Sequence, residues 1–180
     1  DVSAFVVDNE TGALTAAPGS PFPAGKDPKA MAIVGSSTGY NLYVANAGSD
    51  NVSAYAIDMN TGALTALPGS SVAVGTGPTS IVVGVRDPFV FVANHGGSND
   101  ISAFTSAETA MPDGSSQIKL TPVPGSPFPA GGNPLSLALG SSVGGDRVKF
   151  LYSANPDATN PSISGFSVDP ATGALSPLSG

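Results

Sequence analysis

The feature that most constrains this chain is an internal repeat of about 50 residues. A tetrapeptide that begins Val/Ile-Ser and ends in an aromatic residue occurs four times, at 2–5, 52–55, 101–104 and 163–166. The tetrapeptide TGAL occurs three times, at 11–14, 61–64 and 172–175. The octapeptide PGSPFPAG occurs twice without change, at 18–25 and 124–131. Landmarks that recur in one order indicate copies of a single supersecondary unit.

Each repeat predicts four β-strands separated by tight turns. Alternating apolar positions and β-branched or aromatic residues predict strands in the second repeat, at about 30–35, 41–46, 52–57 and 63–67. Asp58 to Gly62 fits a hairpin loop, because Asp bonds the backbone two residues ahead and Gly adopts a positive φ. No segment of useful length has a helical period. We therefore predict an all-β chain.

A four-stranded antiparallel unit repeated at this interval is typical of a β-propeller blade. We predict one propeller segment of about three and a half blades, with a half blade at 1–27 and blades at 28–77, 78–133 and 134–180. The order LYVAN, VSAYAID, TGALT and PGSPFPAG resembles YVTN-type propellers, which include the seven-bladed lactonase (6-phosphogluconolactonase-like) family. This resemblance covers essentially the whole chain. It implies the blade fold, and its motifs are not specific for any activity.

Composition excludes several classes of function. The net charge is −7, with 6 Lys and Arg against 13 Asp and Glu, so nucleic-acid binding through clustered cations is not expected. No apolar run approaches the roughly 20 residues that span a bilayer. The absence of cysteine excludes disulfides, thiolate catalysis and cysteine-ligated zinc. A Lys-poor surface rich in Ser, Thr, Asn and Gly favours a secreted bacterial protein, located outside the cell or on its surface.

Few side chains are candidates for chemistry, and we expect neither a catalytic residue, nor a metal site, nor a cofactor. His95, Arg86 and Arg147 are the weak candidates for a central cleft, with Glu108 as a further acid. The resemblance implies a lactonase site rich in His, Arg and acidic residues in that cleft, but none of these residues lies in a segment that matches a catalytic motif. Asn51 begins a sequon for N-glycosylation, Asn51-Val52-Ser53.

Two segments depart from the repeat. TGAL is missing from 105–119, and the segment 155–161 lengthens a hairpin. Insertions in repeat proteins map to loops on one face and often bind ligands, whereas neutral drift in a tolerant loop is the simpler explanation.

An open arc of blades exposes an apolar face at each end, which favours association. We therefore expect a non-enzymatic structural or adhesive component, a homo-oligomer or a filament subunit. Its candidate interface residues are Val2, Ala4, Phe5, Val7, Leu14, Ile163, Phe166, Val168 and Leu175. One alternative is a lactonase-like hydrolase of sugar lactones, seen as part of a propeller. The other is a ligand-binding module of a larger secreted protein, with carbohydrate as a partner in either case.

Overall fold

The computed structural model describes residues 1–35, 39–69, 71–110, 116–141, 147–157 and 159–179. Within these ranges the chain forms sixteen strands and no helix. Consequently, the described part of the chain contains no helix that could cross a membrane. Parts of both inserted segments, 111–115 and 158, lie outside the described residues.

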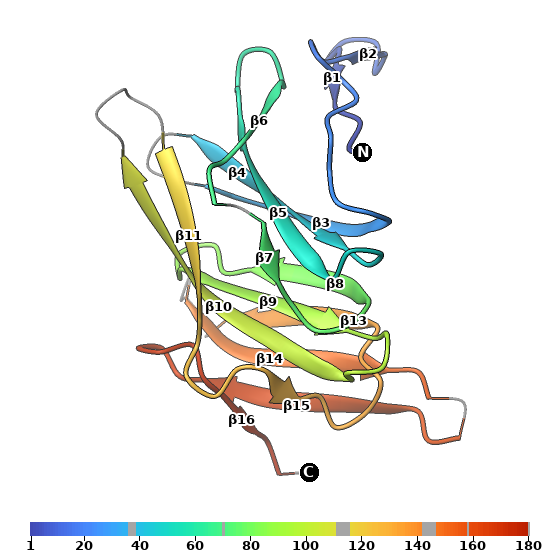
Figure 1. Ribbon diagram of the computed structural model, residues 1–180, viewed down its shortest axis with the longest axis vertical. Helices are drawn as coiled ribbons and strands as arrows, with labels where there is room; N and C mark the ends of the chain where they lie inside the picture. The colour runs from blue at the N-terminus through green and yellow to red at the C-terminus, as the bar shows by residue number, and fades with distance from the viewer. Residues whose placement is uncertain (36–38, 70, 111–115, 142–146, 158, 180) are drawn as a thin grey trace.

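The strands form one two-stranded ribbon, one four-stranded sheet and two five-stranded sheets, and each of these three larger antiparallel sheets contains a row of four strands (Figure 1). The ribbon consists of β1 (Phe5–Val7) and β2 (Leu14–Ala16). Blade 1 consists of β3 (Pro28–Gly35), β4 (Tyr40–Asn46), β5 (Asn51–Ile57) and β6 (Leu64–Ala66). Blade 2 consists of β8 (Pro78–Val83), β9 (Phe89–Asn94), β10 (Asp100–Ala110) and β11 (Ser116–Pro122). Blade 3 consists of β13 (Ser136–Ser141), β14 (Val148–Asn155), β15 (Ser162–Val168) and β16 (Leu175–Pro177).

Two short strands extend the outer side of blades 1 and 2. They are β7 (Val72–Ala73), which pairs with β5, and β12 (Phe128–Pro129), which pairs with β10. The inner strands β3, β8 and β13 contact one another in sequence, as they do around a propeller axis. The predicted all-β architecture of propeller blades is therefore confirmed.

Each blade is apolar on both faces because side chains alternate along a strand. On β4, Tyr43 faces blade 2 and is 1% exposed, while Leu42 faces the ribbon side and is 5% exposed. The same alternation repeats on β9, where Phe91 packs on blade 3 and Val90 packs on blade 1. The core is therefore a series of layers between consecutive sheets.

A buried asparagine ends the second strand of every blade and anchors the corner to the third strand. Asn94 donates from Nδ2 to Asp100 Oδ1 at 2.6 Å and to Ser102 Oγ at 2.9 Å. Asn46 and Asn155 make equivalent pairs of bonds to the third strands of their own blades. These bonds satisfy the buried amide nitrogens, whereas Oδ1 of Asn46 and of Asn94 makes no hydrogen bond among the described residues.

The tight hairpins between third and fourth strands are closed by an aspartate. Asp169 Oδ1 accepts from the amides of Ala171 at 2.9 Å and Thr172 at 2.8 Å, while Gly173 adopts a φ of 79°. The backbone amide of Thr172, followed by that of Ala171, holds the pKa of Asp169 below its ordinary value of 3.8. Asp8 and Asp58 close their hairpins in the same way.

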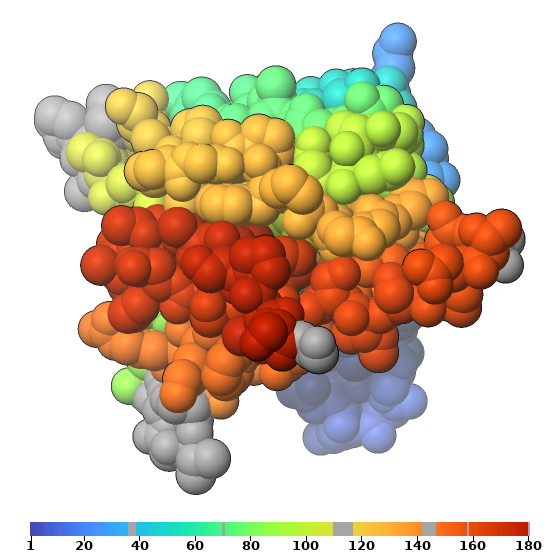
Figure 2. Space-filling model, turned by 90° about the horizontal axis from the view of Figure 1, so that it is seen from below, coloured from blue at the N-terminus to red at the C-terminus, as the bar shows by residue number. Residues whose placement is uncertain are grey.

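The two outermost faces differ from what we expected of them. Ile163 is 76% exposed on the far face of blade 3, which forms the near surface in Figure 2. Phe166, Val168 and Leu175 lie on the opposite face of that blade and are buried against blade 2, so they are not available on an open surface. Val2 is likewise buried, because its side chain packs against Leu42, Val44 and Tyr55 of blade 1.

The ribbon itself is open to solvent. Phe5, Val7 and Leu14 are more than half exposed, and Ala4 is partly buried, hydrogen-bonded through its amide to Ser20 Oγ. Asn51 begins β5 and is partly buried, and its Nδ2 donates to Ser71 Oγ at 3.1 Å. Its glycosylation stays a prediction.

Candidate functional site

The three candidate residues from the sequence lie at opposite ends of β9. His95 follows the last residue of β9, whereas Arg86 lies in the connection before its first residue. Arg147 precedes β14 and lies on the same side as Arg86, with one guanidinium nitrogen 3.8 Å from Asp87 Oδ1. Glu108 is also at this end, where β10 pairs with β11. Because six residues of strand span roughly 20 Å, His95 is well separated from the others.

His95 lies at the end of the axis where the inner strands begin. Its backbone amide donates to the Gly77 carbonyl at 3.0 Å, just before β8. Its ring nitrogen Nε2 is 3.5 Å from Asn133 Nδ2, which belongs to the residue before Pro134 and β13. The imidazole of blade 2 therefore meets the start of blade 3. We call this end of the axis, with Asp27, Lys29, His95 and Asn133, the inner mouth.

Two polar atoms of the His95–Asn133 pair lack a partner among the described residues. His95 Nδ1 and Asn133 Oδ1 are both shielded from solvent and make no hydrogen bond there. A buried polar atom without a partner destabilises the fold by roughly 1–3 kcal/mol, and a bound water, ion or ligand is one way to supply the partner. The pair is therefore a candidate for ligand contact.

One ion pair lies at the corresponding position of blade 1. Lys29 Nζ is 3.0 Å from Asp27 Oδ1, and about half of each side chain is exposed. Such an exposed pair contributes little to stability. Its ammonium and carboxylate groups thus remain accessible to a solute at the inner mouth.

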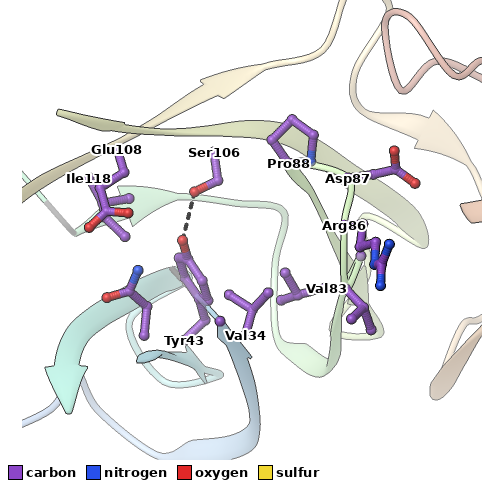
Figure 3. A pocket seen from close by; sticks show the side chains of 13 residues that line it. Val34, Tyr43, Val83, Arg86, Asp87, Pro88, Ser106, Glu108 and Ile118 are labelled. Carbon is purple, nitrogen blue, oxygen red and sulfur yellow. Dashed lines mark hydrogen bonds between the residues drawn. The ribbon is translucent and has the colours of Figure 1, made fainter. Parts of the chain in front are cut away.

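The opposite end of blades 1 and 2 contains a polar cleft of about 220 Å³, which we call the interblade cleft (Figure 3). Tyr43 of β4 and Ser106 of β10 meet across it, with 2.7 Å between their hydroxyl oxygens. In Figure 3, Glu108 and Arg86 lie on opposite sides of this pair. The remaining lining is largely apolar and comprises Val34, Val83, Pro88 and Ile118 among others.

Burial controls the ionisation of the tyrosine in the interblade cleft. Desolvation raises the pKa of Tyr43, the hydrogen bond with Ser106 opposes that rise, and the charge of Glu108 adds to it. Tyr43 is therefore a neutral phenol at physiological pH, able both to donate and to accept a hydrogen bond.

Neither end contains a metal site among the residues that the structure describes. No group of three or more His, Asp or Glu side chains comes together there. The interblade cleft was not foreseen from the sequence. The signal was present in the repeat, because Asn41 stands where the next repeat has Phe89, and the segment 105–119 departs from the pattern.

A family model described as "Lactonase, 7-bladed beta-propeller" matches residues 1–128. A search of curated proteins found no match. Among solved structures, a protein from Lactobacillus plantarum is 22% identical with a TM-score of 0.74, over 98% of this chain and 48% of that one.

Two further solved structures come from proteins with a named activity. A putative 6-phosphogluconolactonase from Bacteroides fragilis is 20% identical with a TM-score of 0.63, over 98% of this chain and 50% of that one. The Pseudomonas aeruginosa periplasmic gluconolactonase PpgL is 21% identical with a TM-score of 0.64, over 92% of this chain and 43% of that one. At these identities the likeness establishes the propeller fold, and the chain spans about half the length of each protein.

The expected structural, adhesive or filament-forming role was wrong. The family match covers most of the chain and points to lactonase-type propellers, which were our alternative. The physical argument failed in part because three of the residues assigned to an open face, Phe166, Val168 and Leu175, are covered by blade 2.

Proposed function

Since the chain belongs to the lactonase, 7-bladed β-propeller family, we propose that it acts in the hydrolysis of a sugar lactone. The match of the family model over residues 1–128 is the observation that carries this proposal. We assign the reaction to the inner mouth, because an imidazole, an ammonium group and unpartnered polar atoms lie at this same end of consecutive blades.

Hydrolysis of a lactone adds water to the ester carbonyl and opens the ring. A general base takes a proton from the attacking water, and a positive group stabilises the oxyanion that develops on the carbonyl oxygen. When the carbon–oxygen bond of the ring breaks, the leaving oxygen takes a proton and the product is a hydroxy acid. In our proposal His95 carries that proton and Lys29 stabilises the oxyanion. Asn133 orients the imidazole through its contact with Nε2.

We propose an unphosphorylated lactone as the substrate. Arginine is the residue best suited to bind a phosphate by two parallel hydrogen bonds. The two arginines of the chain, Arg86 and Arg147, lie at the end of the blades opposite the inner mouth. A neutral sugar ring matches the low charge there better than a phosphorylated one.

Proton release during hydrolysis of glucono-δ-lactone tests this proposal, with the spontaneous rate subtracted. We expect turnover by the purified chain, and we expect His95→Ala to lower kcat/KM by about 10²–10⁴-fold through loss of the base. Arg147→Ala is the matched control, since its side chain is 72% exposed at the other end. Absence of turnover, or equal losses in both variants, would overturn the assignment.

We also propose a location outside the cytoplasm. The low content of Lys and Arg, 6 in 180 residues, supports it. So does the likeness to a protein whose description places it in the periplasm. Fractionation of cells that express the tagged natural gene product would test the location directly. Recovery in the cytosolic fraction would contradict it.

A further inference from the structure

We propose that the interblade cleft is a binding site for one small neutral polyol, with Asn41, Tyr43 and Ser106 as its polar contacts. This site is separate from the inner mouth, because it opens beside the connection before β9, whereas His95 follows the end of β9. The proposal goes beyond lactone hydrolysis and does not depend on it.

The polar groups of the cleft occupy positions that are apolar in the interface between blades 2 and 3. The strand pairings place Asn41 opposite Ala56, Phe89 opposite Thr105 and Phe150 opposite Ser167, so Asn41 corresponds to Phe89. By the same pairings, Tyr43 corresponds to Phe91, and Ser106 corresponds to Val168. Phe89, Phe91 and Val168 form one buried cluster between blades 2 and 3. The interface between blades 1 and 2 thus carries three polar side chains at positions that are occupied by apolar side chains between blades 2 and 3.

Asn41 brings a buried amide group to the wall of the cleft. Its side chain lines the cleft and is only 4% exposed. Its amide group offers both donors and an acceptor to a molecule bound in the cleft.

The extended hairpin of blade 2 covers the outer side of the cleft. Where blades 1 and 3 turn tightly, β10 and β11 continue to pair through Glu108↔Ile118 and Ala110↔Ser116. Ile118 is consequently placed over the cleft and is 2% exposed. The departure from the repeat at 105–119 therefore builds one wall of the site.

Size and chemistry select the class of ligand. A 150 Å³ cavity holds benzene, so 220 Å³ accommodates about nine non-hydrogen atoms, the size of a four-carbon polyol. The hydroxyls of Tyr43 and Ser106 both donate and accept, which matches the alcohol groups of such a molecule. Val34, Val83 and Ile118 offer apolar surface to its C–H groups.

Erythritol is the probe, and methyl NMR of the full chain is the measurement. We expect saturable shifts at the methyl groups of Val34, Val83 and Ile118, with a Kd of about 1 mM. The methyl groups of Val168 and Leu175 lie in the neighbouring interface and should not shift. Equal shifts in both interfaces, or none up to about 100 times that concentration, would overturn the proposal.

Two variants locate the binding. Asn41→Leu should weaken binding more than about tenfold, because it removes the amide that would bond the ligand while keeping a side chain of similar size. Asn60→Leu is the control, since Asn60 lies exposed in the tight hairpin of blade 1, and it should bind as the unaltered chain does. An apolar residue is compatible with folding at position 41, as Phe89 shows in blade 2. Unchanged binding by Asn41→Leu would refute the site.

Discussion

The two complete interfaces between blades use the same backbone register and are both largely apolar, but they differ in the side-chain chemistry of one layer. Between blades 2 and 3, Phe89 and Phe91 meet Val168 in a continuous apolar layer. Between blades 1 and 2, the corresponding Asn41 and Tyr43 meet a serine and leave a cleft of about 220 Å³. The comparison shows that one repeated fold can place a filled layer and a polar cleft side by side.

The hairpin that covers each interface explains the difference. At the second interface the tight turn ends at Gly173, and a Cβ placed there would lie 2.6 Å from the Phe89 ring. The large ring therefore requires a glycine above it. At the first interface, Leu120 corresponds to Leu175 in register, so Ile118 takes the place of Gly173 and the smaller Asn41 lies beneath it. The pair of Phe89 and Gly173 at the second interface is thus replaced by Asn41 and Ile118 at the first.

The largest effect is expected from giving the second interface the residue of the first. Phe89→Asn removes a ring that is 2% exposed and buries an amide, and should lower the free energy of unfolding by about 4 kcal/mol. Urea denaturation measures it. The control is Phe150→Asn, at the same register position on the open face of blade 3, which should cost about 1 kcal/mol. Similar losses in the two variants would contradict the proposed layer.

Adding a methyl group at Gly173 should disrupt the packing of Phe89 between blades 2 and 3. Gly173→Ala combines a positive φ of 79° with a clash against Phe89, and should cost about 3 kcal/mol. Gly12→Ala in the ribbon has a similar φ of 73° but open space around it, so it should cost about 1 kcal/mol. Thermal unfolding of both variants compares them. If Gly12→Ala were as harmful, the φ angle alone would account for the loss.

The hydrogen bond of the first interface can be measured by a double-mutant cycle. Tyr43→Phe and Ser106→Val introduce the residues of the second interface, and each alone leaves a hydroxyl without its partner, at a cost of about 1 kcal/mol. The double variant should cost less than the sum of the two, with a coupling of about 1 kcal/mol. Chemical denaturation of the four proteins tests this. Strict additivity would mean that the two hydroxyls do not interact.

The smallest effect concerns pH. The backbone amides keep the pKa of Asp169 below 3.8 in the folded chain, so its contribution is complete above that value and is lost as the pH falls through the lowered pKa. Hydrogen exchange of the Gly173 amide should therefore accelerate between about pH 5 and about pH 2, after correction for intrinsic exchange. In Asp169→Asn this extra acceleration should disappear. The β10–β11 hairpin has Ala107 in place of the aspartate and should lack the effect.

The repeat predicted the architecture because each landmark has a local physical meaning. Asp58 and Gly62 specify a tight turn by their own bonding and φ, and VSAY specifies a half-buried strand. The sequence could not show which polar strand residues meet across an interface. Asn41 and Ser106 are 65 positions apart, and the register that brings them to one cleft depends on how two blades pack.

The candidate residues for catalysis illustrate the same limit. His95 and Arg86 are nine positions apart, and one strand between them places them at opposite ends of the blade. Asn133, which contacts the imidazole, was not a candidate, because nothing distinguishes an asparagine before a proline from other turn residues. Its position before the inner strand of the following blade becomes evident only in three dimensions.

The asparagine at each blade corner has an evolutionary consequence. Among the described residues, the side chains of Asn46, Asn94 and Asn155 form hydrogen bonds within their own blades, so a duplicated blade brings its own corner with it. A duplicated blade does not bring a neighbour whose side chains match its own face. A second copy of blade 2 inserted after the first would place Phe89 against Ser106 and the side chain of Ile118, where a glycine is required. A duplicated blade therefore has to fit the contacts made by its new neighbours as well as carry its own corner.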